Sequence, residues 1–269
     1  MQKMTEVIWL LFIWLTGACI FSFADAAAWR LVRNMDILRD RSRCDFCGRV
    51  LSFWEMLPVA GWLLCRGRCG FCGRRVSLRH PAAELAGGFT AWLCAAYLGI
   101  SAESVLTFLF LSVLAAVTMA DLDVMEIPDC FHAVILILTG LSMLFSMLDA
   151  AAGQGSNWIS APSLLSRITG GLCVSLPMWL LTMKIPGAFG GGDIKLSAVC
   201  GLFLGWRRMT AAVILAVLSA GAWGVFLLAG RRAGRKDHFA FAPFLCGGMF
   251  AVIFWGGPLW AWYKGLLLP

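Results

Sequence analysis

The chain has 269 residues, of which 60% are hydrophobic and only 14% are charged. Its mean hydropathy is +0.81. Soluble globular domains carry about a quarter of their residues as charged side chains, so the composition excludes an ordinary soluble protein. The net charge of +7 therefore has to be interpreted in the context of a membrane.

Long stretches without charged residues recur along the chain, as in helices that cross a bilayer. The stretches are 7–24, 85–102, 104–120, 130–148, 168–183, 196–206, 209–230 and 239–263. About 20 apolar residues span the hydrocarbon core, with a range of roughly 17–25. Six of the stretches have such a length. The stretch 168–183 is one residue short of it, and the stretch 196–206 is long enough only if its helix starts among the preceding glycines. The pattern predicts an all-α polytopic membrane protein with about eight transmembrane helices.

The first apolar stretch has two interpretations. Lys3, the apolar run and Ala24-Asp25-Ala26 resemble a cleaved signal peptide. Cleavage would export residues 25–80, which hold eleven arginines against five acidic residues, a net charge of +6. Because short arginine-rich loops stay in the cytoplasm, we expect an uncleaved helix at 1–24, with its N-terminus outside and a cytoplasmic insert at 25–80.

This orientation fixes the side of every later loop. The loops at 121–129 and 184–195 and the basic segment 231–236 are expected in the cytoplasm. The loop at 149–162, which has no Lys or Arg, is expected outside, and Arg207-Arg208 also falls there, against the rule. The positive charge is thus mostly a topology signal, and we expect a lipid bilayer and no nucleic acid as partner.

The insert contains two Cys-x-Phe-Cys-Gly units, which begin at residues 44 and 69. Paired C-x-x-C units at this spacing predict a four-thiolate zinc site. The predicted ligands are Cys44, Cys47, Cys69 and Cys72. Four protein ligands leave no open position, so a structural zinc ion is expected. A redox dithiol is the alternative; Cys65 is a nearby fifth thiol that we interpret as a bystander.

Acidic residues gather in two places that the predicted topology puts on one side of the membrane. Asp121 ends the third apolar stretch, and Asp193 directly follows three glycines in PGAFGGGDIKLS, residues 186–197. Two carboxylates that share one proton can hydrolyse a peptide bond, because one takes a proton from water while the other donates to the carbonyl oxygen. Asp121 and Asp193 are therefore the candidate catalytic pair.

The other acidic residues have structural interpretations. Asp129, after Pro128, suits the first turn of a helix, where a negative charge complements the helix dipole. Glu84, after Pro81, is interpreted in the same way. Asp123 and Glu126 are interpreted as solvated loop charges.

The glycines before Asp193 favour peptidase chemistry. Gly190 and Gly192 would let an extended substrate backbone approach the carboxylate. A helix-packing surface is an alternative for these glycines, whereas a phosphate nest would not place its own carboxylate on the phosphate. Two other functions remain open: an ion-coupled transporter that uses Asp121 and Asp193, and a membrane-tethered zinc-ribbon scaffold.

Five motifs follow one another along the chain. They are Pro58-Val-Ala-Gly-Trp62-Leu, Arg66-Gly-Arg-Cys69-Gly-Phe-Cys72, Arg79-His80-Pro81-Ala-Ala-Glu84, Asp121-x-Asp123-x-x-x-Ile127-Pro128-Asp129 and Gly190-Gly-Gly192-Asp193-Ile-Lys195-Leu. In order, spacing and predicted topology they resemble the bacterial type IV prepilin leader peptidases, which are membrane aspartyl proteases of the GxGD type. The resemblance covers nearly the whole chain.

The resemblance implies that Asp121 and Asp193 are catalytic. The residues in supporting positions would be Asp123, Asp129, Gly190, Gly192 and Lys195. The implied organisation is a first transmembrane helix at 1–24, a four-cysteine zinc insert at 25–80 and a protease core at 81–269, in the bacterial cytoplasmic (inner) membrane. The implied substrates are type IV prepilins, or the pseudopilins of type II secretion, whose short basic leader is cut at the cytoplasmic face.

Many members of that family also methylate the new N-terminus with S-adenosylmethionine. In this chain the segment 22–33 lacks the Asn-Val pair and the Arg-Leu-Pro expected before the cysteines. S-Adenosylmethionine is therefore expected only as the cofactor of a second activity.

The helix dipoles predict which aspartate does what. Asp121 ends a helix, where the negative pole disfavours ionisation, and Asp193 begins one, where the positive pole favours it. We expect Asp193 to act as the base and Asp121 as the proton donor. Lys195 is interpreted as a marker of the cytoplasmic edge.

Overall fold

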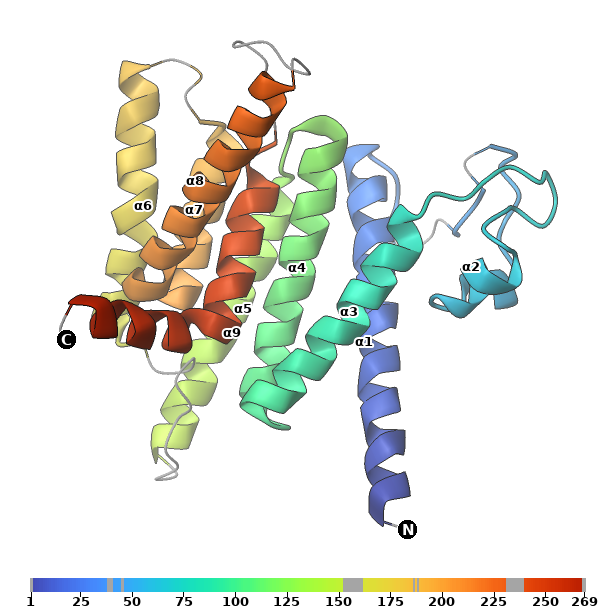
Figure 1. Ribbon diagram of the computed structural model, residues 1–269, viewed down its shortest axis with the longest axis horizontal. Coiled ribbons are helices and arrows are strands. Elements are labelled where there is room, and N and C mark those ends of the chain that lie inside the picture. Colours follow the sequence, from blue (N-terminus) through green and yellow to red (C-terminus); the bar gives the residue numbers. More distant parts are fainter. Residues whose placement is uncertain are drawn as a thin grey trace. The chain divides into compact units, whose positions relative to one another are not determined.

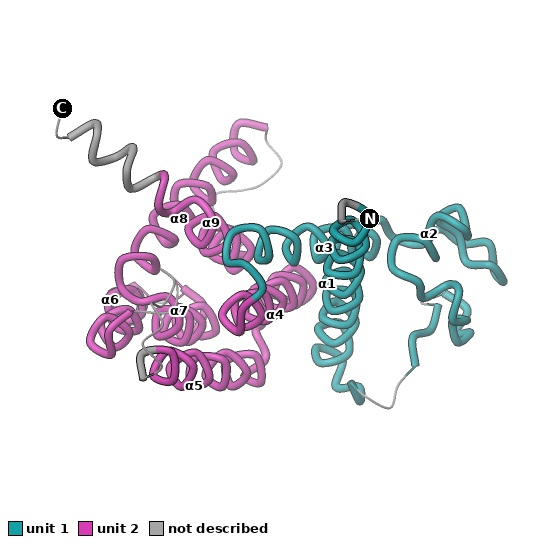
Figure 2. The backbone as a smooth tube through the Cα atoms, turned by 90° about the horizontal axis from the view of Figure 1, so that it is seen from below, with its two compact units in different colours: residues 1–100 teal, residues 101–269 magenta. Residues whose placement is uncertain are grey.

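A computed structural model of the chain describes residues 2–37, 41–44, 46–151, 162–185, 187, 189–230 and 240–267 (Figure 1). Over these residues the chain is helical and has no β-strand, apart from two isolated bridges in the insert. The predicted all-α class is confirmed. The basic segment 231–236 and most of the loop at 149–162 lie outside the described residues. The helices form two compact units, residues 1–100 and 101–269, coloured separately in Figure 2.

Unit 1 is a helix pair with a small insert between its members. The pair is α1 (Gln2–Val32) and α3 (Arg79–Leu98), and the insert carries η1 (Trp54–Met56) and α2 (Ala60–Leu64). Glycines let the two long helices approach closely: a Cβ added at Gly17 would lie 2.5 Å from the Ala91 Cβ, and one at Gly88 would overlap the Trp14 ring. Small residues at such a contact are typical of helices that pack within a membrane.

Glu84 connects three parts of unit 1. Because α3 begins at Arg79, Glu84 lies in its second turn, and it is buried. Its Oε1 accepts a hydrogen bond from the Ser22 hydroxyl on α1 at 2.8 Å, and its Oε2 accepts one from the Val59 N–H in the insert at 2.6 Å. The interpretation of Glu84 as a helix-start acid was wrong, because its partners come from distant segments that sequence spacing does not reveal.

Unit 2 is a bundle of six helices over its described residues. They are α4 (Ala102–Val124), α5 (Asp129–Ala151), α6 (Leu164–Lys184), α7 (Gly191–Leu204), α8 (Trp206–Ala229) and α9 (Ala242–Leu267). Helix α7 packs on α5 and α6, and α9 packs on α4 and α8. In the core, the rings of Phe110 on α4 and Phe203 on α7 stack with their centroids 4.2 Å apart.

Five of the described helices are long and apolar enough to cross a membrane. They are α1 from Met4, α4, α5 as far as Asp149, α6 and α8. The apolar part of α9 that qualifies, Ala242–Pro258, is shorter. Helix α7 begins at Gly191 and so includes two of the glycines before Asp193, which lengthens the short stretch at 196–206. The multi-pass architecture is supported, while the count of eight spans stays a prediction.

Candidate active site

Asp121 lies in the last turn of α4, where the chain leaves the helix through Met125. Met125 adopts a left-handed conformation, with φ 56° and ψ 30°, and its N–H donates to the Asp121 carbonyl at 2.9 Å. The Asp121 side chain is only 5% exposed, and its Oδ2 accepts a hydrogen bond from the Ala242 N–H at 3.1 Å. Ala242 is the first residue of α9, whose first N–H groups have no partner inside the helix. Asp121 therefore caps α9 from the end of α4.

Asp193 is the third residue of α7, and Gly190 is the residue that precedes the helix. The Asp193 carboxylate accepts a hydrogen bond from the Gly190 N–H. This contact is half of a capping box, in which the third helical residue reaches back to the N-cap amide. The other oxygen, Oδ1, is buried and has no hydrogen-bond partner among the described residues. One oxygen of Asp193 is thus tied to the backbone while the other can bind a water or a proton.

The structure brings these two aspartates together. The charge of Asp121 acts on Asp193, and both carboxylates act on Cys246, a buried residue of α9. Beside them the rings of Phe189 and Phe241 meet edge to face, with centroids 5.8 Å apart, where the chain enters α7 and α9. The ends of α4, α7 and α9 therefore form one acidic site with aromatic neighbours.

This arrangement is suited to acid–base chemistry. When two carboxylates lie close together, one stays protonated while the other ionises, and the pair titrates as a unit. Such a pair can activate a water molecule and protonate a leaving group in a single site. The unpartnered Asp193 Oδ1 is a position at which that water could be held.

A second cluster fixes the start of α7 to the start of α5. Lys195 Nζ donates to Asp129 Oδ1 at 2.8 Å, and Nδ1 of His132 lies 3.3 Å from the same oxygen. Asp129 is the first residue of α5, as its expected helix-start role requires. His132 is buried and was not among the predicted site residues. Its spacing of three residues from Asp129 is the signal that could have found it.

Three further predicted site residues, Asp123, Gly190 and Gly192, lie close in sequence to Asp121 or Asp193. Asp123 is exposed and lies two residues from Asp121, a spacing that directs side chains to different faces of a helix. A Cβ at Gly190 would lie 3.3 Å from Asp193 Oδ2, so this glycine leaves room for the carboxylate itself. A Cβ at Gly192 would lie 3.2 Å from Ile127, so that glycine allows close packing of α7 on the segment after α4.

The four predicted zinc ligands form one cluster in the insert. The Sγ atoms of Cys44, Cys47, Cys69 and Cys72 all lie within 4.8 Å of one another, and those of Cys44 and Cys72 are 3.9 Å apart. Tetrahedral sulfurs about 2.3 Å from a zinc ion would be separated by about 3.8 Å. Gly48 and Gly73 both have φ of 68°, which the tight turn after each pair requires. The donor set fits zinc, and Cys65 stays outside it.

Hydrogen bonds prepare one of these thiols for a metal. The backbone N–H groups of Cys72 and Phe71 lower the pKa of Cys69 to about 6. A thiolate is therefore favoured there at neutral pH, and the thiolate is the form that binds a metal. Bound zinc would connect the two Cys-x-Phe-Cys turns and hold the insert together.

Cys72→Ser should lower the zinc content of the purified protein from about one ion per chain to near zero, because a tetrahedral structural site loses one of its four ligands. Elemental analysis by mass spectrometry measures this. Cys65→Ser is the matched control and should keep its zinc. Loss of zinc from both variants would show that the cluster of four is not the metal site.

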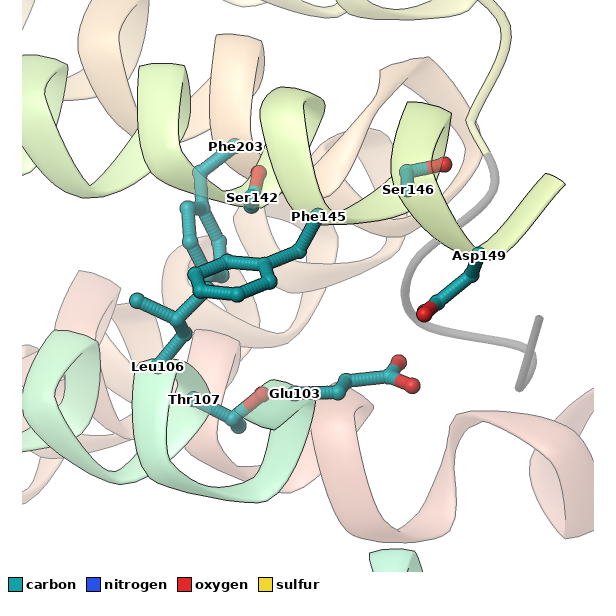
Figure 3. A pocket seen from close by; sticks show the side chains of 8 residues that line it. All are labelled: Glu103, Leu106, Thr107, Ser142, Phe145, Ser146, Asp149 and Phe203. Atoms are coloured by element: carbon teal, nitrogen blue, oxygen red, sulfur yellow. The ribbon is translucent and has the colours of Figure 1, made fainter. Parts of the chain in front are cut away.

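A small pocket lies at the opposite end of α4 from the aspartates. It has a volume of about 20 Å³, enough for one water molecule, and is lined by Glu103, Thr107, Ser142 and Asp149, among others (Figure 3). The charge of Arg208 acts on Glu103. Arg208, which the predicted topology places outside against the positive-inside rule, thus has an acidic residue near it. Asp121 is 18 residues further along α4, about 27 Å at 1.5 Å per residue, so the pocket is separate from the acidic site.

The chain is similar to known proteins over both of its units. A model described as the type IV leader peptidase family matches residues 108–225, which include both aspartates. A model described as the bacterial peptidase A24 N-terminal domain matches residues 15–98, which include the cysteine cluster. A curated relative from Bacillus subtilis is 31% identical over 262 residues, which cover 96% of this chain and 98% of the relative. The chain belongs to the type IV leader peptidase family.

Other relatives in the family show similar agreement. The chain is 30% identical to a Myxococcus xanthus protein, over 84% of this chain and 66% of that protein. It is 29% identical to a Burkholderia pseudomallei protein, over 92% of this chain and 77% of the relative. All three relatives bear the name prepilin leader peptidase/N-methyltransferase. No solved structure matches this chain. Membership of the family makes the protein a peptidase.

Proposed function

We propose that this peptidase is an aspartyl endopeptidase that removes the short basic leader of type IV prepilins or pseudopilins. The observation that carries the proposal is the meeting of Asp121 and Asp193 at the ends of three helices, with Asp193 Oδ1 unpartnered. A water held between the carboxylates would attack the scissile carbonyl while the protonated carboxyl donates to its oxygen. The names of the relatives supply the substrate class.

Cleavage is proposed at the cytoplasmic face of the inner membrane. The eleven arginines between residues 25 and 80 favour a cytoplasmic insert by the positive-inside rule. The loops that carry Asp121 and Asp193 then fall on the same side in the proposed topology. A leader that has not crossed the membrane would reach the acidic site there, and its positive charge would be attracted by the two carboxylates.

Asp193 is proposed as the base and Asp121 as the acid. Asp193 Oδ1 has no hydrogen-bond partner among the described residues and can hold the attacking water, which suits a base, whereas Asp121 lies where the last turn of α4 meets the start of α9. Asp121 Oδ2 accepts the Ala242 N–H, so the donated proton would sit on Oδ1.

The asparagine variants distinguish the two roles. Asparagine keeps an N–H donor but cannot act as a base at neutral pH. A positioned proton donor contributes about 10²-fold or more to the cleavage rate, and the asparagine N–H at position 121 should preserve part of this contribution. Asp121→Asn should therefore cleave the leader roughly ten times faster than Asp193→Asn. Cleavage rates with a purified precursor measure the ratio. The reverse order would exchange the two roles.

Co-expression with a pilin-like precursor tests the function itself. Wild-type protein should convert the precursor to the shorter mature form, which mass spectrometry identifies by the loss of its leader. Asp193→Ala should leave the precursor intact while accumulating in membranes at a normal level. Ion flux in proteoliposomes without any leader cleavage would instead support the transporter alternative.

N-Methylation of the new N-terminus is proposed as a second activity, because the relatives' names include it. The structure does not identify a site for S-adenosylmethionine. Among the described residues of unit 1, the buried carboxylates of Asp25 and Glu84 are already bonded, Asp25 to Arg79 and His80, and Glu84 to Ser22 and Val59. Transfer of a labelled methyl group to the processed pilin would test the activity directly.

A further inference from the structure

The insert of unit 1 contains an open cavity of about 600 Å³ beside the end of α1. One part of its wall is polar and basic, and another part is apolar. The polar part includes Arg30, Arg41 and Ser42, and the apolar part includes Leu51, Phe53 and Met56. A wall of this kind suits an amphiphile that has an anionic head and a hydrocarbon tail.

Arg30 is held in place for such a ligand. It is 9% exposed, its Nη1 donates to the Ile37 carbonyl at 2.6 Å, and its Nη2 lies 3.4 Å from the Ser42 hydroxyl. A guanidinium has five N–H donors in a rigid plane that matches the oxygens of a phosphate. Arg41 lines the same cavity and is exposed. The insert therefore presents a buried, hydrogen-bonded arginine and an exposed one to the same volume.

Phe53 lines this cavity, and further large apolar side chains follow it in η1 and α2. Phe53, Trp54, Leu63 and Leu64 are each between 60% and 69% exposed. Exposing so much apolar surface to water is unfavourable, and a group of such residues marks an interaction site. Tryptophan in particular is enriched where the hydrocarbon of a bilayer meets its headgroups.

Hydrogen bonds place this segment beside the helix pair. Glu84 joins Val59 to Ser22, and Ser22 lies eight residues before Arg30 on α1, about 12 Å along the helix. Val59 has φ +60°, an unusual conformation for a β-branched residue, which the Glu84 hydrogen bond helps to hold. In Figure 1, α2 is level with the first turns of α3. The headgroup layer on each side of a bilayer is only about 5–8 Å thick, so the segment around Val59 reaches hydrocarbon depth when Arg30 is among the headgroups.

We infer that this cavity binds an anionic phospholipid of the bilayer that α1 is long and apolar enough to cross. The lipid phosphate lies at Arg30 and Arg41, its acyl chain follows Phe53 and Met56, and Trp54, Leu63 and Leu64 enter the interface. The net charge of +6 over residues 25–80 attracts anionic lipid and repels a basic leader peptide. The choice of the cytoplasmic leaflet rests on the proposed function; the site itself does not.

Native mass spectrometry of the full-length protein in detergent tests the site. The protein would be titrated with phosphatidylglycerol or with phosphatidylcholine, and bound lipid would be counted. Phosphatidylglycerol should bind more tightly. Arg41→Gln should weaken its binding about fivefold, the contribution of one arginine near an anionic surface. Phe53→Ser should weaken the binding of both lipids.

Matched controls separate the site from general attraction. Arg68→Gln and Phe46→Ser change an exposed arginine and an exposed phenylalanine elsewhere in the insert, and both variants should bind lipid like the wild type. The zinc content of all four variants should be unchanged, which verifies that the insert is folded.

Three results would overturn the inference. The first is equal affinity of the protein for phosphatidylglycerol and phosphatidylcholine. The second is an equal loss of phosphatidylglycerol affinity in Arg41→Gln and Arg68→Gln. The third is displacement of phosphatidylglycerol by inorganic phosphate or by a basic leader peptide. Lipid counting does not depend on catalysis. If Asp193→Ala still cleaved precursors, the proposed function would fail while this lipid site stood.

Discussion

Replacing either Asp193 or Asp121 by alanine should slow leader cleavage about a thousandfold, and the double variant should be no slower than the single ones. A positioned acid or base contributes roughly 10²–10⁴-fold to a rate. Residues that act as a unit lose most of that contribution when one member is removed. The two carboxylates are expected to form such a unit because the charge of Asp121 acts on Asp193 and both act on Cys246. Cleavage of a purified precursor under single-turnover conditions measures the three rates.

Glu126→Ala is the control for this series. Glu126 is exposed, lies five residues after Asp121, and is interpreted as a solvated loop charge. Its variant should cleave within about twofold of the wild type, since surface substitutions usually change little. If Asp121→Ala were as active as Glu126→Ala, the two aspartates would not be the catalytic pair. If the losses in the single variants multiplied in the double variant, the carboxylates would act independently.

Gly201→Val should destabilise unit 2 by about 3 kcal/mol and abolish leader cleavage. In the structure α6 and α7 touch backbone to backbone, and a Cβ at Gly201 would overlap the carbonyl of Gly170. An added side chain must push the helices apart, which costs roughly 1–3 kcal/mol or more in a packed core. Because α7 carries Asp193, its displacement would also move Asp193 away from Asp121, its partner in the proposed catalytic pair. A thiol-reactive dye that reports exposure of buried Cys200 during heating measures the loss of stability.

Gly221→Val makes the same chemical change where there is room for it. Gly221 is on α8, is exposed, and has no atom within 4 Å of an added Cβ. Its variant should unfold within a few degrees of the wild type and retain cleavage. Equal melting temperatures for the two valine variants would contradict the close packing of α6 on α7.

The zinc cluster and the helical class were predictable because both depend on local spacing. Each C-x-x-C unit positions its own two sulfur atoms for one metal ion, and the glycine after each pair allows the tight turn. Sequence spacing left only the contact between the two units unpredicted. Apolar runs likewise predict helices whatever their neighbours are. The cysteine sulfurs gather within 4.8 Å, and α4, α5 and α8 follow their apolar stretches closely.

The partners of the candidate site residues were not predictable, because they come from distant segments. The Ala242 N–H that binds Asp121 is 121 residues away in the chain, and a backbone donor has no sequence signature. The Lys195–Asp129 contact spans 66 residues in the same way. The dipole argument for Asp121 considered only the end of α4. The start of α9 brings a positive helix pole to the same carboxylate, so both aspartates contact a helix start and the helix dipoles alone do not distinguish their roles.

The hydrogen bond from Ala242 to Asp121 has a consequence for shortening the protein. The family model ends at residue 225, yet the amide that orients one of the two aspartates is supplied by the helix that begins at residue 242. A chain truncated after α8 would keep every acidic side chain of the proposed centre and lose the group that aims one of them. A shortened chain should therefore keep the start of α9 if Asp121 is to stay in place.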